Sequence, residues 1–338
     1  MSVTIHDVAR EANVSISTVS RVLNGRARVN RETRSRVLEV MDRLGYYPNL
    51  AARNLVRKNA ETIGLIIPHL SGSVFMDPFF PEVLSGIEEV VNEAGYRMLI
   101  VTNREKLRQE NIYVRMFREG SIDGLILMNT SEDDENILAL EETDYPFVLV
   151  GRFPRGNKIN YVDCDNKRGA YEATEHLIKH GHEKIAFINT LPNLASSSDR
   201  AEGYRQALQR HQIKERAEFM RVADHTIQGG LMAMKELLGL PQRPTAVFAG
   251  NMLMAYGAFR AITESGLQVP DDIALMGYDL CAFEPILNVK ISTFKQPVAE
   301  MGRVAARMLF DLILKKEPVQ TQVIMRSEFV PGTSCGCR

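Results

Sequence analysis

The spacing of hydrophobic residues along the chain changes character near residue 60. Ahead of that point, apolar side chains recur at helical spacing, as in Ile5, Val8 and Ala12, and Thr4 and Asp7 stand where a capping box would begin that helix. Beyond it, short continuous apolar runs alternate with longer stretches of helical periodicity. This pattern predicts a small all-helical unit followed by a larger α/β unit.

Two further helices are expected in the first unit. Ser15 can cap a helix over residues 16–24 that Gly25 closes, and Asn30 can cap a longer helix that Gly45 ends. Only a brief break separates the first helix from the second, which is typical of a helix-turn-helix. The exposed side of the second helix would carry hydroxyls and one guanidinium, from Ser15, Ser17, Thr18, Ser20 and Arg21. Hydroxyls suit phosphates, and arginine suits the edge of guanine.

The distribution of charge separates the same two units. Residues 1–60 contain eleven Lys and Arg against five Asp and Glu, whereas the rest contains thirty against thirty-seven. Each hydroxyl of the second helix, taken alone, is explained by a solvated helix face. Together with the basic surplus, these side chains favour a nucleic-acid reader joined to a separate acidic sensor.

The segment after Gly45 has the composition of a short helix that begins near Pro48. Its six or seven residues are fewer than the roughly 12–15 that make an isolated helix even marginal in water, so we expect it to fold only against a partner. Leu55 in this segment is either part of a plain linker or an apolar wedge for a DNA minor groove.

The second unit reads as two lobes, each with a parallel sheet covered by helices. Its predicted strands are 63–67, 98–101, 124–128, 147–150, 184–188, 245–249 and 273–276, and its helical candidates include 80–94, 168–180, 200–211 and 256–266. This number of strands is high for one sheet, and two doubly wound lobes with a cleft between them fit better. Ligands of such folds bind beyond the carboxyl ends of the strands.

The patterns VTIHDVAREANVSISTVSRVLN and GYYPNLAAR within residues 2–57 resemble the head and hinge of the LacI/GalR family of bacterial transcription regulators. The resemblance continues to about residue 335. It implies that Ile16, Ser17 and Arg21 meet base edges. It places phosphate contacts at Thr4, Ser15, Ser20, Asn24, Arg28 and Tyr46. The remaining expected DNA contacts are Thr18, Asn49, Ala52 and the wedge Leu55.

The same resemblance implies the whole architecture. An N-terminal all-α helix-turn-helix head at 1–47 and a hinge helix and linker at 48–60 would join an α/β core at 61–338 of the type I periplasmic-binding-protein-like fold, with two doubly wound lobes. Crossing strands are expected near Tyr161, Ile291 and Val319. They would divide the core into an N-lobe at about 61–161 and 292–320 and a C-lobe at about 162–291 and 321–338.

Several side chains are expected to bind an effector in the cleft. Arg200 is predicted in the first turn of a helix, where a cation opposes the helix dipole, so helix stability does not explain it. The resemblance places the motif containing Arg200, together with Asn251 and Asp279, at the effector. These groups can hold vicinal hydroxyls, and Phe79 or Phe80 can supply an apolar face for a sugar. Further expected cleft residues are Arg152, Asp165 and His225.

Departures from the family pattern concern the ligand. Met252 and Leu280 stand where relatives usually have Asp, and His225 stands where they often have an aromatic residue. The segment 69–80 is longer than usual, which resembles the branch that answers to maltose and other α-glucosides.

Composition and motifs exclude other classes. The chain has no GxGxxG, P-loop or zinc-protease motif, no secretion signal and no apolar run of membrane length, so we expect a cytoplasmic protein without catalytic, cofactor or metal sites. His176 and His180 are expected at the end of a helix, and Ser196–Ser198 in a polar loop. The four cysteines are expected to be free thiols.

The sequence thus predicts a homodimeric repressor of carbohydrate-utilisation genes that binds pseudo-palindromic double-stranded operator DNA and responds to a small molecule, a sugar. One alternative is a solute-binding or enzymatic α/β protein with an incidental basic head. The other is a regulator controlled by a protein partner or a nucleobase corepressor.

Overall fold

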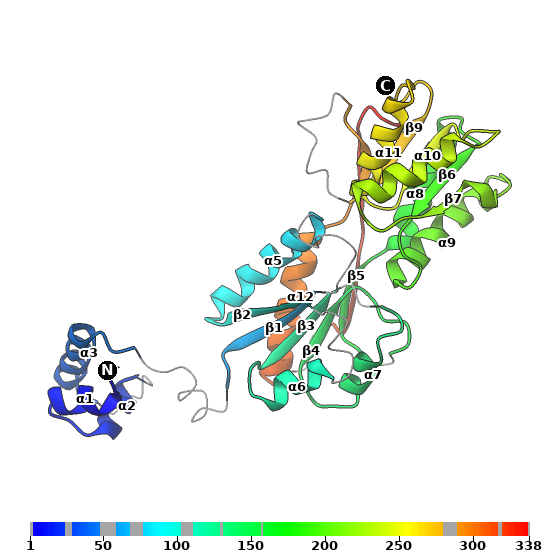
Figure 1. Ribbon diagram of the computed structural model, residues 1–338. Coiled ribbons are helices and arrows are strands. Elements are labelled where there is room, and N and C mark those ends of the chain that lie inside the picture. Colours follow the sequence, from blue (N-terminus) through cyan, green and yellow to red (C-terminus); the bar gives the residue numbers. More distant parts are fainter. Residues whose placement is uncertain are drawn as a thin grey trace. The chain divides into compact units, whose positions relative to one another are not determined.

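We describe the protein from a computed structural model that covers residues 3–23, 29–47, 59–67, 77–102, 111–128, 131–156, 158–279, 289–316 and 320–336. The chain divides into two compact units, residues 1–60 and residues 61–338 (Figure 1). No helix in the described ranges is long and apolar enough to cross a membrane.

The first unit contains three described helices, α1 (Ile5–Glu11), α2 (Ile16–Leu23) and α3 (Arg31–Leu44). The predicted caps are confirmed. Thr4 and Asp7 form a capping box, the Thr18 amide donates to Ser15 Oγ at 3.2 Å, and the side chain of Asn30 caps α3. Gly45 follows α3 with φ +62°, a left-handed conformation that favours glycine. The predicted hinge residues 48–58 and Gly25 lie outside the described residues.

A small apolar cluster holds these helices together. Val8, Val19 and Val37 have no exposed surface, and each comes from a different helix. Because the cluster is small, burial on this scale gives only a marginal free energy of folding.

The N-lobe of the second unit is built on a parallel sheet with the strand order β11-β5-β4-β3-β1-β2. Its strands are β1 (Thr62–Ile67), β2 (Arg97–Thr102), β3 (Gly124–Met128), β4 (Phe147–Val150), β5 (Tyr161–Cys164) and β11 (Gln322–Met325). Its helices are α5 (Phe79–Glu93), α6 (Ile112–Arg118), α7 (Glu135–Glu141) and α12 (Val298–Ile313). Since neighbouring strand residues point to opposite faces, Leu65 packs in the cluster with α5 and α12, and Ile66 packs with α6 and α7.

The C-lobe contains a second sheet with the order β12-β10-β9-β8-β6-β7, in which only β12 is antiparallel to its neighbour. Its strands are β6 (Ile185–Asn189), β7 (Met220–Val222), β8 (Ala246–Ala249), β9 (Ala274–Tyr278), β10 (Ser292–Lys295) and β12 (Glu328–Val330). Helices α8 (Asn166–Lys179) and α9 (Ala195–Arg210) cover one face, and α10 (Ile227–Leu238) and α11 (Met252–Glu264) cover the other. All the strands predicted from apolar runs are present, with ends shifted by at most two residues.

The chain passes between the lobes after β5, after β10 and after β11, and these positions correct the predicted lobe boundaries (Figure 1). The prediction placed 162–164 and 321–325 in the C-lobe and 292–295 in the N-lobe. Strands β5 and β11 instead pair with each other in the N-lobe sheet, and β10 pairs with β9 in the C-lobe. The boundaries shift because each strand completes its pairing first, and the chain then crosses at the strand's carboxyl end.

One predicted helix begins too late. Helix α9 starts at Ala195, so Arg200 lies in its second turn and residues 196–198 form helix rather than a polar loop. The dipole argument for Arg200 was therefore wrong. The expected helix end at His180 is confirmed, since His180 is the C-cap of α8. Cys164 and Cys335 are buried, and Cys281 and Cys337 lie outside the described residues.

Candidate nucleic-acid interface and effector pocket

The N-terminal end of α2 presents hydroxyls to solvent. Ser15 Oγ lies 2.8 Å from Ser17 Oγ and 2.9 Å from Thr18 Oγ1, so three hydroxyls gather where the helix leaves backbone N–H groups unpaired. Ile16 in the same turn is 40% exposed although it is apolar. An exposed hydroxyl cluster at a helix N-terminus suits a phosphate, and the isoleucine beside it suits an apolar base edge.

The other expected DNA contacts fall into two groups. Thr4 and Arg21 are exposed, and Ser20 and Tyr46 are half-buried. Outside the described residues lie Asn24, Arg28, Asn49, Ala52 and Leu55. The described head thus presents hydroxyls and one guanidinium on α2, which can bind a polyanion.

The effector pocket lies between the lobes at the carboxyl ends of their parallel strands. It holds about 500 Å³ of empty space, part of it open to solvent. The lining residues are Asp77, Phe79, Phe80, Val150, Gly151, Asp163, Asn166, Ser196, Arg200, His225, Asp279, Gln296 and Met301. This combination of two aromatic rings with many polar groups is typical of a small-molecule site.

Arg200 is the central cation of the pocket and only 5% exposed. Its Nε donates to Asn166 Oδ1 at 2.9 Å and its Nη1 donates to the Gly250 carbonyl at 2.5 Å. Its Nη2 lies 3.7 Å from Asp279 Oδ2, and its guanidinium stacks 4.1 Å from the centre of the Tyr278 ring. These contacts fix the guanidinium rigidly against the pocket wall.

Asp279 follows β9 with φ +77°, a left-handed conformation that is strained for a non-glycine residue. Its amide donates to the Phe294 carbonyl at 2.9 Å, and its side chain accepts a hydrogen bond from Gln296. Burial raises the pKa of Asp279, whereas Arg200 opposes that rise. The strained backbone turns this carboxylate toward Arg200.

Two further carboxylates line the pocket, and the sequence did not single them out. Burial and the Asp279 carboxylate raise the pKa of Asp77 to about 6. Burial also raises the pKa of Asp163 to about 6, and Asp199 adds to the rise. Both residues lie near the end of an element: Asp77 just before the start of α5, and Asp163 next to the last residue of β5. The rule that ligands meet the carboxyl ends of strands was a signal that could have found Asp163.

His225 faces the pocket as a neutral ring. Its backbone adopts φ +60°, and burial together with Arg200 lowers its pKa to about 4. Its Nε2 is buried and has no hydrogen-bond partner among the described residues, whereas Asn251 Nδ2 lies 3.4 Å from its Nδ1. Nε2 can hydrogen-bond to a ligand hydroxyl.

Three expected cleft residues do not line the pocket. Asn251 is buried and caps α11 by accepting from the Met254 amide at 2.8 Å. Asp165 caps α8. Arg152 reaches from the loop after β4 to Asp199 on α9, where its Nη2 lies 2.6 and 2.5 Å from the two carboxylate oxygens. These side chains hold the pocket's surroundings in place.

The expected residues Phe79, Phe80, Arg200, His225 and Asp279 do come together in the pocket. The sequence reasoning missed five polar lining residues, which are Asp77, Asp163, Asn166, Ser196 and Gln296. Among the described residues, no group of three or more His, Cys, Asp and Glu is arranged to hold a metal ion. The polar groups that line the pocket can hydrogen-bond to a polar molecule.

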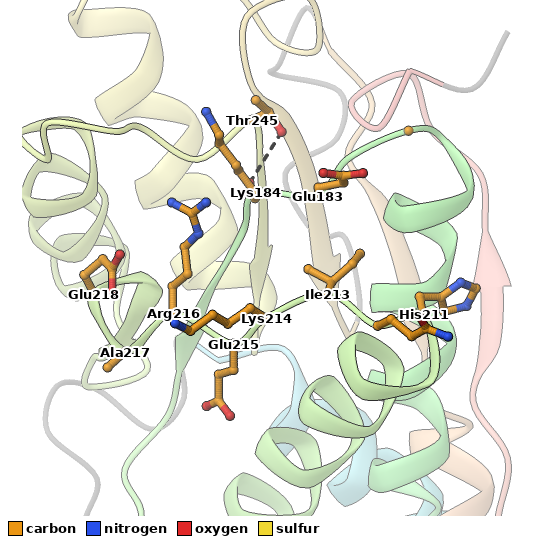
Figure 2. A pocket seen from close by; sticks show the side chains of 12 residues that line it. Glu183, Lys184, His211, Ile213, Lys214, Glu215, Arg216, Ala217, Glu218 and Thr245 are labelled. Carbon is orange, nitrogen blue, oxygen red and sulfur yellow. Dashed lines mark hydrogen bonds between the residues drawn. The ribbon is translucent and has the colours of Figure 1, made fainter.

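A second hollow, the distal groove, lies at the amino ends of β6 and β8, where Lys184 and Thr245 precede the two strands (Figure 2). It is larger, about 1480 Å³ including open solvent, but its charges are mixed and mostly spread around the rim. Arg216 on its wall donates to Gln242, and Glu215 pairs with Arg205. Size alone does not make it a ligand site, because no buried polar groups converge on it.

Comparison with known proteins covers both units of the chain. The family model of bacterial regulatory proteins of the lacI family matches residues 4–49, and a model of a periplasmic binding protein-like domain matches residues 174–335. Catabolite control protein A of Priestia megaterium is 33% identical over 98% of this chain and 100% of its own length.

Two solved structures match almost the whole chain. The lac repressor dimer bound to operator and the anti-inducer ONPF has a TM-score of 0.88 at 28% identity, and 99% of each chain is covered. The complex of the transcriptional regulator CelR with cellobiose has a TM-score of 0.76 at 30% identity, covering 98% of this chain and 99% of that one.

Proposed function

Because the chain belongs to the LacI family of bacterial regulatory proteins, we propose that it represses carbohydrate-utilisation genes and that a sugar in the effector pocket changes its affinity for operator DNA. It is a DNA-binding transcriptional regulator rather than an enzyme. The head reads DNA through the described residues of α2 and through the expected hinge contacts, and the core carries the sensor.

The observation that carries the sugar proposal is the pairing of Arg200 with Asp279 beside two aromatic rings. A fixed guanidinium and a carboxylate 3.7 Å apart can donate to one hydroxyl of a sugar and accept from its neighbour. Phe79 and Phe80 supply the apolar surface that a sugar ring's C–H face needs. The similar structure of CelR holds cellobiose, which supports a sugar in kind.

The finer proposal is an α-glucoside, which rests on the length of the segment before Phe79. Residues 69–76 of that segment lie outside the described residues. Control by a protein partner is the second candidate, because the chain is 33% identical to catabolite control protein A. A nucleobase corepressor is the third.

We propose a homodimer on a pseudo-palindromic operator. Two heads on one two-fold symmetric body read two half-sites in opposite orientation. The similar lac repressor structure is a dimer on its operator, which supports this arrangement.

The test begins by selecting operator sequences from random DNA with the purified full-length protein. A panel of α- and β-linked glucosides is then screened for release or tightening of the selected DNA. The proposal predicts that at least one sugar shifts DNA affinity in the parent protein and not in Arg200→Ala. If DNA binding ignores every sugar but changes with a protein fraction or a nucleobase, one of the other candidates replaces it.

A further inference from the structure

The charges that face the effector pocket do not balance. Its lining contains three carboxylates, Asp77, Asp163 and Asp279, and one guanidinium, Arg200. His225 adds no charge near neutral pH, because its pKa lies at about 4. When all three carboxylates are ionised, the lining therefore has two more negative groups than positive groups.

Arg200 cannot neutralise this excess, because Asp279 already compensates it. Arg200 Nη2 lies 3.7 Å from Asp279 Oδ2, and the two side chains are only 6% and 13% exposed. The guanidinium is also held by Asn166 and the Gly250 carbonyl, so it cannot swing toward another carboxylate without losing these hydrogen bonds. A ligand carboxylate or phosphate would have to compete with Asp279 for the one cation.

The charged groups around the pocket do not correct the imbalance either. Arg152 Nε lies 3.9 Å from Asp163 Oδ2, but its Nη2 binds both carboxylate oxygens of Asp199 at closer range. The net charge of Arg152, Asp163 and Asp199 together stays negative, since one guanidinium faces two carboxylates. Near Asp279, Glu82 and Lys295 carry opposite charges and cancel.

We infer that the pocket selects against anionic ligands, so that the effector is a sugar without a carboxylate or phosphate, and that Asp77 and Asp163 determine this selectivity. The inference rests on the proposed function and adds the charge class of the ligand. An uncharged sugar donates hydroxyl hydrogens to the carboxylates, whereas an acid sugar brings a like charge into a space that is poorly screened. An amino sugar satisfies the same acceptors.

The pocket offers conservative variants for the test. Asp163 Oδ1 accepts from the Cys164 amide at 2.8 Å and from Asn166 at 3.3 Å, and Asp77 Oδ1 accepts from the Phe79 amide at 3.0 Å. An asparagine oxygen can keep these bonds, so Asp163→Asn and Asp77→Asn remove charge with little change of shape. Glu183→Gln removes the same charge from an exposed site in the distal groove and is the matched control.

The experiment titrates the full-length protein by calorimetry above about pH 7, where both carboxyls are mainly ionised. Each of glucose, galactose, maltose and cellobiose is compared with its uronic acid, its 6-phosphate and its 2-amino counterpart. The parent protein should bind an uncharged or amino sugar at least about tenfold more tightly than the acid counterparts. Asp163→Asn and Asp77→Asn should each narrow that ratio roughly severalfold, whereas Glu183→Gln should leave it unchanged.

Three outcomes contradict the inference, and each points to a different fault. If an acid sugar or sugar phosphate binds as tightly as its uncharged counterpart, the charge selectivity is wrong while the sugar sensor stands. If neither the uncharged and amino sugars nor their acid counterparts bind, the proposed function is wrong, and the inference that rests on it is wrong as well. An unchanged ratio in both Asn variants would show that selectivity does not arise from Asp77 and Asp163.

Discussion

Arg152 in the N-lobe and Asp199 in the C-lobe form an ion pair in which one guanidinium nitrogen lies 2.6 and 2.5 Å from the two carboxylate oxygens. A second contact joins the lobes nearby, where the Glu132 amide donates to the Asn193 carbonyl at 2.9 Å and Asn193 Nδ2 donates to Ser131 Oγ at 3.2 Å. Both contacts lie outside the lining of the effector pocket. They hold the two lobes together beside the pocket.

Breaking this ion pair should weaken effector binding without touching the ligand. In Arg152→Met or Asp199→Asn, part of the binding energy must bring the lobes together, and we expect a loss of roughly fivefold in affinity. The double variant should lose no more than either single variant, because both remove one interaction. Calorimetric titration with the identified sugar measures all three proteins, and additive losses would count against the coupling.

Arg200→Ala should abolish the effector response and leave DNA binding nearly intact. It removes a buried guanidinium that holds Asn166, Gly250 and Asp279, so effector affinity should fall more than tenfold. Arg200→Lys keeps the charge but not the planar fork, and it should also lose most of the response. The head is a separate compact unit, so operator titrations without sugar should match the parent. Parallel loss of DNA binding would show that the change unfolds the core.

Asp163 should make the core less stable as the pH rises, which is opposite to an ordinary aspartate. Its folded pKa of about 6 lies above its usual value of 3.8, so the folded state binds more protons between these values. Its contribution is therefore largest below about pH 4 and is lost as the pH rises through 6, on the order of 1–3 kcal/mol. The melting temperature of Asp163→Asn should gain on that of the parent as the pH rises through this window, and it should be higher than the parent's near neutral pH.

The control for this measurement is His225, which acts with the opposite sign. Its folded pKa is lowered from 6.5 to about 4, so stability is lost as the pH falls through that range. The two effects partly cancel in the parent, and the difference between Asp163→Asn and the parent isolates the carboxyl. A difference curve that is level across the window would contradict the raised pKa of Asp163.

The logarithm of the affinity of the head for DNA should fall linearly with the logarithm of the salt concentration, because its cations replace counterions on phosphates. Arg21→Ala should weaken binding and relax preference for one base, since Arg21 is expected to meet a base edge. Ser17→Ala is the matched variant one turn earlier on the same exposed face of α2 and removes no charge, so it should leave the salt slope unchanged. Filter binding across a series of salt concentrations measures this slope. A slope near zero would contradict a DNA interface built on phosphate contacts.

The parts of the fold that follow from local pattern were predictable. Continuous apolar runs such as Gly124–Met128 mark buried parallel strands, and Ser15, Asn30 and Gly45 mark helix ends by their own chemistry. The start of α9 was not predictable in this way. Its first turn is rich in serine, and packing rather than helix propensity begins it: Ala195 is buried and Ser197 Oγ donates to the Thr190 carbonyl.

The candidate site was predictable only where a motif carried it. Arg200 and Asp279 came from family motifs, whereas Asp77 and Asp163 are single aspartates whose burial depends on contacts between distant segments. Asn251 shows the reverse case. It stands after a strand as a ligand residue would, but its side chain caps α11.

The three connections between the lobes begin at the carboxyl ends of β5, β10 and β11, and that position joins mechanics to recognition. Asn166 follows the first connection and Gln296 lies in the second, and both also line the pocket. A bound molecule that pulls on these two side chains applies its force at the pivot itself. A small rotation of one lobe about these connections moves the far end of that lobe through a longer distance.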